Sequence, residues 1–381
     1  MDYDFDEVIE RRGGDSIKWN QPFEKDFLPM PVADMDFKVS PAILESLHRR
    51  TEHGIFGYAQ APVSTIEAIQ EKLLKDYGWA IDPAWLVWLP GVVVGLNVLC
   101  RMFSPHSVVT TTPVYPPFLA SPLQMGCRRV DVPLDVVGNR YELPFDRLNA
   151  ALGGDARLFM HCNPHNPSGR VMTQPEQEKV AELCLANDVV ICADEIHYGL
   201  VLEEGMRHLP IATLSTEVAD RTITFISPSK TYNLAGLMWA FAVIPNPVLR
   251  QRFMHAARGI VNEVNPYGYA ACEAAYRRSD DWHDELIRIL RRNRGLVEST
   301  IRQVPGLWMP HVEATYLAWI DCRSLNISES SPALHFEKHG IGLSDGRNFG
   351  APGFVRMNFA CPLPTLQEGL HRFKQASGVS A

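Results

Sequence analysis

The pattern of apolar and polar positions between residues 90 and 245 predicts a doubly wound α/β domain. Five short segments there are almost continuously apolar or β-branched, which is typical of strands buried on both faces of a largely parallel sheet. Stretches with helical spacing of apolar residues separate them, as in residues 174–187. The predicted strands are residues 107–111, 157–162, 188–193, 222–226 and 239–244.

The flanking regions predict a second, smaller α+β domain. Ser40-Pro41 is a helix-start signal, because a capping residue is followed by proline at the first helical position. After Pro247 the pattern changes to long helices, then strands, then a last helix. The predicted helices are residues 41–50, 64–77, 248–261, 267–278, 282–303 and 364–375, and the predicted late strands are residues 316–320 and 354–359. We therefore expect a large domain of residues 50–280 and a small domain of residues 1–49 and 281–381.

Composition excludes several classes of protein. The 381 residues carry 36 Lys+Arg and 44 Asp+Glu, a formal charge of −8. A continuous basic surface for nucleic acid is therefore not expected. A hydrophobic content of 46% supplies enough apolar material for more than one core and excludes a mainly disordered chain.

The chain begins with an acidic stretch, and no apolar run reaches the roughly 18 residues of a membrane span. We expect a cytoplasmic protein without a membrane anchor. The eight cysteines are scattered and never form a Cys-x-x-Cys pair, so buried reduced thiols are favoured over a zinc site or disulfides. No metal is expected.

Two segments that follow predicted strands carry candidate chemistry. Lys230 comes just after residues 222–226 and is flanked by Ser227 and Ser229. Burial there would lower the pKa of the amine and make it nucleophilic, although a surface lysine at a helix start remains the alternative. Asp194 follows an equally apolar strand, where a carboxylate is costly unless it meets a cation. It is a candidate partner for a protonated ring nitrogen, or else a helix cap.

Two more segments add binding groups. The run from residue 163 to 169 contains two Asn-Pro pairs and a glycine, a rigid turn that can hold the side-chain amide of Asn166 in place. Gly91 precedes an apolar helical run that begins with Val92 and Val93. The free N–H groups and the dipole at this helix start offer an anion site.

The order of Gly91, Tyr115, Asn166, Asp194 and Lys230 resembles fold-type I pyridoxal phosphate (PLP) enzymes of the class I/II aminotransferase superfamily. More narrowly, the chain resembles the MalY/PatB-type cystathionine β-lyases, also called carbon-sulfur lyases. The pairs Met35-Asp36 and Ile196-His197 favour this subgroup over ordinary aminotransferases. The resemblance extends over residues 32–37, 54–58, 163–169, 194–197, 227–237, 316–319 and 353–358.

The resemblance implies a PLP-dependent transferase-like fold and a role for each matching residue. Lys230 would form the Schiff base with the cofactor, and Asp194 would keep the pyridine nitrogen protonated. Tyr115 would stack on the ring. Asn166 would donate to the ring hydroxyl, and His197 stands where many aminotransferases use a tyrosine for the same oxygen.

The same resemblance implies a phosphate site, a substrate site and a homodimer with shared active sites. Arg356 would grip the α-carboxylate of an amino acid substrate, with Asn166 and Tyr58 close to that substrate. The phosphate ligands would be the backbone of Gly91, Val92 and Val93, the hydroxyls of Ser227 and Ser229, and Tyr58 from a second subunit.

Two positions depart from the related sequences. Met238 stands where many aminotransferases carry a phosphate-binding arginine, which weakens the standard aminotransferase interpretation. Pro31 stands where the lyase subgroup commonly has tryptophan ahead of Val-Ala-Asp-Met-Asp, near the substrate entrance. The choice of substrate is therefore left open.

The implied reaction is β-elimination. The freed amine of Lys230 would remove the Cα proton, and a thiolate at Cβ would leave, so that cystathionine or another S-substituted cysteine would yield thiol, pyruvate and ammonia. Three alternatives remain: an aminotransferase, a biosynthetic enzyme acting on an S-conjugated cysteine with a redirected outcome, and a regulatory protein whose site is vestigial.

Overall fold

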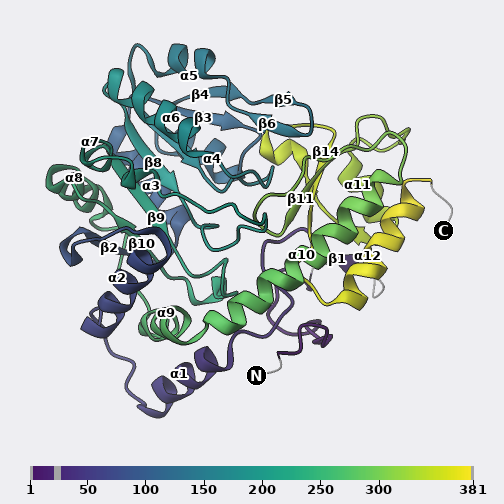
Figure 1. The fold of residues 1–381 in the computed structure, drawn as a ribbon, viewed down its shortest axis with the longest axis horizontal. Coiled ribbons are helices and arrows are strands. Elements are labelled where there is room, and N and C mark those ends of the chain that lie inside the picture. The colour runs from purple at the N-terminus through teal and green to yellow at the C-terminus, as the bar shows by residue number, and fades with distance from the viewer. Residues whose placement is uncertain (1–2, 21–26, 379–381) are drawn as a thin grey trace.

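The computed structural model describes residues 3–20 and 27–378, and its largest feature is a sheet of seven described strands (Figure 1). The strand order is β2-β10-β9-β8-β7-β3-β4. Every neighbouring pair from β9 to β4 is parallel, whereas β10 runs antiparallel to both β9 and β2. The strands are β2 (Leu86–Leu89), β3 (Ser107–Thr112), β4 (Arg128–Pro133), β7 (Ala156–Cys162), β8 (Val190–Asp194), β9 (Thr222–Ile226) and β10 (Ala240–Val243).

Helices cover both faces of this sheet. On one face the ring of Phe225 in β9 lies 6.1 Å from that of Phe253 in α8, and apolar side chains of α3 join the same cluster. On the other face Val180 and Leu148 pack with Phe159 and Ile191 of the strands. The helices on the two faces are α3 (Val92–Phe103), α4 (Pro116–Gln124) and α8 (Pro247–Ala257), and α5 (Phe145–Leu152), α6 (Gln174–Ala186) and α7 (Thr216–Asp220). The predicted doubly wound α/β architecture is confirmed.

The five strands predicted in this region are all present, and the misses have physical causes. β4 was not predicted because it is an edge strand whose residues are mostly exposed or half-buried, so it lacks a continuous apolar run. The hairpin of β5 (Asp135–Val137) and β6 (Arg140–Glu142) was missed for a similar reason. β10 returns antiparallel after a connection that contains the 3-10 turn Ala235–Leu237 and no α-helix to carry the chain across the sheet for a parallel return.

The C-terminal part and the N-terminal segment share a smaller set of strands. β14 lies between β11 and β13 in an antiparallel sheet. β1 pairs in parallel with β12, which joins the N-terminal segment to the C-terminal part of the chain. The elements are β1 (Leu28–Pro29), β11 (Leu317–Asp321), α11 (Pro332–Lys338), β12 (Ile341–Gly342), β13 (Ser344–Asp345), β14 (Phe354–Asn358) and α12 (Leu363–Ala376).

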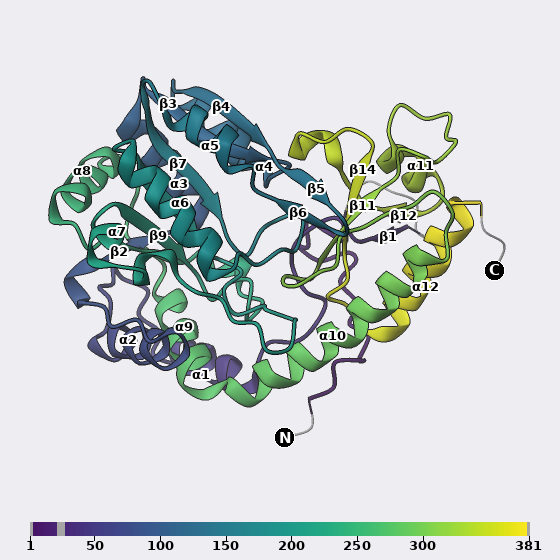
Figure 2. The same ribbon diagram turned by 45° about the horizontal axis from the view of Figure 1, so that its top comes forward.

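Helices link the two parts. Figure 2 shows α10 (Asp280–Arg302) running from the neighbourhood of α1 and α9 to α12 beside the smaller sheet. α1 (Pro41–Glu52) packs on α9 (Pro266–Arg278), where the Ser46 hydroxyl donates to the carbonyl of Ala270 at 3.0 Å. α2 (Val63–Tyr77) packs on α9 as well. The division at residues 50 and 280 stays a prediction.

Two predictions from composition can be compared with the described residues. All eight cysteines are buried and free, as expected. Within residues 3–20 and 27–378, no helix combines the length and the apolar character that crossing a membrane requires.

Candidate active site

A cavity of about 460 Å³ lies at the carboxyl ends of the parallel strands, where ligands bind in α/β sheets. The loops after β3, β7, β8 and β9 form its walls, and β14 closes it from the smaller sheet. Every predicted site residue except Tyr58 lines it: Gly91, Val92, Val93, Tyr115, Asn166, Asp194, His197, Ser227, Ser229, Lys230 and Arg356. The chain thus brings together residues that lie up to 265 positions apart, from Gly91 to Arg356.

Lys230 reaches into this cavity from the loop after β9. Its Nζ donates a hydrogen bond to the backbone carbonyl of Ala33 at 2.7 Å. Loss of hydration in the enclosed cavity lowers the pKa of the amine to about 8, and the nearby positive charge of Arg356 acts in the same direction. A substantial neutral fraction near neutral pH makes this amine a nucleophile and a base.

Asp194 is the last residue of β8 and is only 3% exposed. Ile196 N–H donates to its Oδ1 at 3.1 Å, and among the described residues its carboxylate forms no ion pair within 4 Å. Burial raises the pKa of this carboxyl to about 7, although the Ile196 hydrogen bond opposes the shift. A cationic ring nitrogen beside it would relieve the cost of the buried charge.

Arg356 and Asn166 meet across the cavity, one from β14 and the other from the loop after β7. Arg356 Nη1 donates to Asn166 Oδ1 at 2.9 Å, and Nη2 donates to the carbonyl of Pro31 at 3.0 Å. Burial lowers the pKa of Arg356 to about 10, which still leaves the guanidinium charged. Its Nε is buried and has no hydrogen-bond partner among the described residues.

Tyr115 and His197 line the cavity with side chains that carry no charge. Tyr115 precedes α4, and its backbone N–H donates to the carbonyl of Asn166 at 3.0 Å, which ties the loops after β3 and β7 together. Burial raises the pKa of its phenol. Burial also lowers the pKa of His197 to about 3, so the imidazole is neutral, and its Nδ1 has no partner among the described residues.

The opposite end of the cavity is suited to an anion. α3 begins at Val92, and no side chain of the described residues caps it, so the N–H groups of its first turn are open. Ser229, in the loop of Lys230, lines the same cavity. Ser227 instead donates its hydroxyl proton to the carbonyl of Trp239 at 2.7 Å and accepts a hydrogen bond from Ser229 N–H. Ser227 therefore braces the loop, and its contact with a phosphate stays a prediction.

The remaining predicted positions have different outcomes. Tyr58 is 97% exposed and does not line the cavity of its own chain. Met238 and Pro31 both line it, so the two departures from related sequences lie at the site itself.

Sequence reasoning missed Ser344, which also lines the cavity. Its hydroxyl donates to the carbonyl of Pro31 at 2.9 Å, and it faces Arg356 across β13 and β14. No sequence pattern marks this serine, because its place depends on strand pairing.

These features fit a phosphorylated pyridine aldehyde. The cavity offers an amine for the aldehyde at Lys230 and, at Asp194, a buried carboxylate that forms no ion pair with any described residue. It also offers an open helix N-terminus for the phosphate at Val92. Groups of that kind are what PLP requires.

The family model for aminotransferase class I and II matches residues 25–373. The chain belongs to this family. Cystathionine beta-lyase PatB of Bacillus subtilis (strain 168) is 36% identical over 384 residues, which cover 98% of this chain and 99% of PatB.

Solved structures of the family agree along the whole chain. The crystal structure of OvoB is 41% identical with a TM-score of 0.96 and full coverage of both chains. Cystalysin from Treponema denticola, which contains pyridoxal 5′-phosphate, is 30% identical with a TM-score of 0.94 and 99% coverage of both chains. The predicted family, its dependence on PLP and the fold-type I architecture are confirmed.

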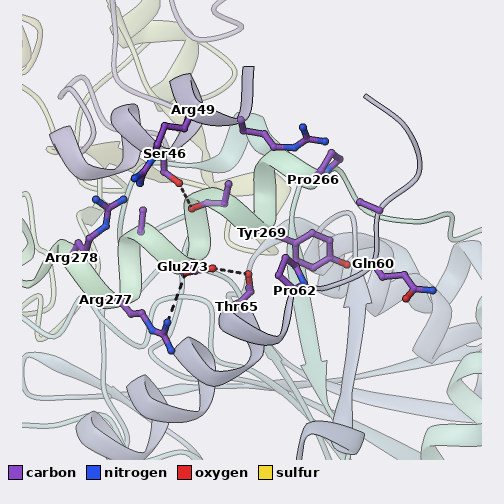
Figure 3. A pocket seen from close by; sticks show the side chains of 14 residues that line it. Ser46, Arg49, Gln60, Pro62, Thr65, Pro266, Tyr269, Glu273, Arg277 and Arg278 are labelled. Atoms are coloured by element: carbon purple, nitrogen blue, oxygen red, sulfur yellow. Dashed lines mark hydrogen bonds and ion pairs between the residues drawn. The ribbon is translucent and has the colours of Figure 1, made fainter. Parts of the chain in front are cut away.

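A second cavity, of about 510 Å³, lies between α1, α2 and α9 and contains none of the predicted site residues (Figure 3). Three of the four arginines that line it pair with glutamates: Arg278 with Glu45 at 2.8 Å, Arg277 with Glu71 at 3.0 Å and Arg49 with Glu45 at 3.6 Å. The fourth, Arg50, donates to the carbonyl of Ile55 at 2.8 Å. Glu273 accepts hydrogen bonds from Ser64 and Thr65. We therefore place no chemistry there.

Proposed function

We propose that this aminotransferase-family chain is a PLP-dependent carbon-sulfur β-lyase that cleaves cystathionine or another S-substituted L-cysteine. The observation that carries the proposal is the meeting of three groups in one cavity: the Lys230 amine, the Asp194 carboxylate and the Arg356 guanidinium. The similarity to a protein named cystathionine beta-lyase favours elimination over transamination. The loss of the aminotransferase arginine at Met238 points the same way.

Each wall of the cavity would hold one part of the cofactor. Lys230 would bind the aldehyde, Asp194 the ring nitrogen and the first turn of α3 the phosphate. Asn166 keeps its Nδ2 for the ring oxygen because its Oδ1 already accepts from Arg356. Tyr115 would cover one ring face. PLP, when bound, supplies an electron sink for the negative charge that develops at Cα.

The protein groups bind the substrate and move the proton. Arg356 binds the α-carboxylate through a planar, charged fork that β14 holds in place. Lys230 Nζ takes the Cα proton, since its lowered pKa suits a base near neutral pH. The electron pair of that C–H bond then forms the Cα–Cβ double bond. The Cβ–S bond breaks, and the sulfur keeps its bonding electron pair and leaves as a thiolate. Water converts the released aminoacrylate to pyruvate and ammonia.

We also propose a homodimer in which Tyr58 of each chain serves the other chain's cavity. Tyr58 lies in a segment with two further exposed apolar side chains, those of Ile55 and Phe56. Met254 and Ile260 add exposed apolar surface. Exposed apolar groups of this kind are typical of a surface that another chain covers.

The test is an elimination assay without any keto acid. We would mix the holoenzyme with L-cystathionine and a set of S-alkyl and S-aryl L-cysteines and measure pyruvate and thiol. We expect equal amounts of both, and a loss of at least about 10³-fold in Lys230→Ala. Lys179→Ala is the matched control, because that lysine is half-buried and its ion pair among the described residues is with Glu182. Turnover that appears only after a keto acid is added would instead identify an aminotransferase.

A further inference from the structure

Residues 30–37, here called the strap, run across one wall of the active-site cavity. Pro31, Val32 and Ala33 of the strap line that cavity directly. The strap lies between the loop that carries Lys230 and the strand that carries Arg356, and it is hydrogen-bonded to both. The strap therefore contacts the cofactor lysine through the carbonyl of Ala33 and the substrate-binding arginine through the carbonyl of Pro31.

On the arginine side, Asn358 holds the strap. It lies two residues after Arg356 on β14 and is buried. Its Nδ2 donates to the carbonyls of Val32 and Asp34, each at 2.6 Å, and its backbone N–H donates to Met30 at 2.8 Å. One side-chain amide thus holds the carbonyls on either side of Ala33.

On the lysine side, Asn233 holds the strap by the same chemistry. It lies three residues after Lys230 and has a left-handed φ of +58°, a conformation that asparagine tolerates. Its Oδ1 accepts from Met35 N–H at 2.9 Å, and its Nδ2 donates to the carbonyls of Met35 and Phe37, each at 3.0 Å.

A third anchor comes from the N-terminal residues. The carboxylate of Asp36 accepts from Lys18 Nζ at 2.6 Å, from Arg11 Nη1 at 2.5 Å and from Trp19 Nε1 at 2.8 Å. Lys18 is only 2% exposed, so it meets the strap in the protein interior. Arg11 also pairs with Asp34 at 2.8 Å. The strap is therefore fixed at both ends and along its outer side.

These anchors fix the position of the Ala33 carbonyl, which lies between the two carbonyls that Asn358 binds. This oxygen accepts from Lys230 Nζ at 2.7 Å and from the hydroxyl of Tyr316 at 3.1 Å. The side chain of Lys230 is long and flexible. A hydrogen bond to a fixed acceptor restricts the positions that its amine can occupy. A base that is held in one position transfers a proton faster than a base whose side chain is mobile.

We propose that Asn358 is a positioning residue for Lys230: by fixing the strap, it makes the Ala33 carbonyl the holding point of the lysine amine whenever that amine is not bonded to the cofactor. This inference rests on the proposed function in one respect, that Lys230 takes the Cα proton. Asn358 itself does not line the cavity and acts through the strap.

The proposal separates two states of the enzyme. While Lys230 is bonded to the cofactor, its nitrogen does not need the Ala33 carbonyl, so cofactor affinity should not depend on Asn358. Once a substrate amine has displaced Lys230, the freed amine depends on that carbonyl. A defect at Asn358 should therefore appear in proton transfer and leave cofactor binding unchanged.

The test compares Asn358→Asp with Asn293→Asp in the holoenzyme. Aspartate keeps the size of asparagine but cannot donate to two carbonyls when ionised. Asn293 is the matched control because it is equally buried and its Nδ2 also donates to two carbonyls, those of Phe359 and Cys361, which lie outside residues 30–37. Proton transfer is read as exchange of the Cα hydrogen of L-alanine in deuterated water, which needs no leaving group.

We expect Asn358→Asp to slow this exchange by about tenfold to a hundredfold. Its KM for L-alanine and its PLP dissociation constant should stay within about threefold of the wild-type values. The wavelength of its visible cofactor band should be that of the wild type. Asn293→Asp should exchange at the wild-type rate. Wild-type exchange in Asn358→Asp, or an equal loss in both variants, would overturn the proposal. Because L-alanine carries no thiol, a failure of the lyase proposal leaves this result readable.

Discussion

At the scale of single residues, burial decides the chemistry of the site. The same cavity raises the pKa of Asp194 to about 7, lowers that of Lys230 to about 8 and lowers that of His197 to about 3. Desolvation is the largest cause in each case, because charge is disfavoured wherever water is excluded. Pairs of titratable groups shifted in this way are a mark of acid-base catalysis.

Asp194→Asn tests the charge state of the cofactor-free protein. The pKa of Asp194 in the folded chain, about 7, lies above the usual value of about 4, so the folded state holds its proton more tightly than the unfolded state. Its stabilising contribution is therefore present at low pH and is lost as pH rises from about 4 to 7. We expect the free energy of unfolding of Asp194→Asn, relative to wild type, to rise by on the order of a few kcal/mol across that window.

Urea unfolding at pH 5, 6, 7 and 8 measures this difference. Asp146→Asn, at an exposed carboxylate of α5, is the control. A difference that stays constant with pH would contradict the raised pKa. In the holoenzyme we expect Asp194→Asn to bind PLP more weakly and to lose at least about a hundredfold in kcat, because the ring nitrogen loses its counter-charge.

At the scale of elements, strand ends and one helix start create the site. Asp194 ends β8, Lys230 follows β9, and Asn166 follows β7. These strands are parallel, so their carboxyl ends meet at one edge. α3 directs its uncapped N-terminus at the same cavity. Backbone direction therefore places one carboxylate, one amine and one anion site together.

Val92→Pro tests the role assigned to α3. Val92 is the first residue of the helix, where proline is well tolerated and removes only a free N–H group. If this N–H binds the cofactor phosphate, we expect PLP affinity to fall about tenfold or more, in line with about 1.5–3 kcal/mol for a hydrogen bond to a charged group. The kcat at saturating PLP should change little.

Fluorescence titration of the cofactor-free protein with PLP measures this affinity. Thr216→Pro is the control, because it places proline at the first position of α7, which does not border the cavity. Unchanged affinity in Val92→Pro would place the phosphate elsewhere.

At the scale of the whole molecule, the site joins distant parts of the chain. β14 brings Arg356, the N-terminal segment brings the strap, and the main sheet brings Lys230 and Asp194. In the proposed dimer a second chain would complete the site, since Tyr58 is 97% exposed and does not line the cavity of its own chain. The proposed dimer is thus a prediction about catalysis as well as about assembly.

Hybrid dimers test this sharing of sites. We would co-express differently tagged Tyr58→Phe and Lys230→Ala chains and isolate the mixed dimer. If Tyr58 serves the partner, one of the two sites in the mixed dimer contains both native residues, so we expect about half the wild-type activity per dimer. If Tyr58 acts within its own chain, no site has both residues, and the activity should not exceed half that of the Tyr58→Phe homodimer. A purified monomer with full activity would contradict the dimer itself.

The sequence by itself determined the local elements and the residue types of the site. Continuous apolar runs predicted β7, β8 and β9 because strands buried on both faces need apolar side chains at every position. Unusual polar residues directly after those runs, Asp194 and Lys230, marked the chemistry. The match to known motifs supplied the family, which the comparisons confirm.

Only the tertiary structure decided which distant groups meet. Edge strand β4 escaped notice because its exposed face carries polar residues. Ser344 and Asn358 reached the site or its strap through strand pairing, which no short-range pattern encodes. The lowered pKa of Lys230 and the raised pKa of Asp194 likewise depend on how completely the folded walls exclude water. Chemistry of this kind comes from burial, and burial exists only once the chain has folded.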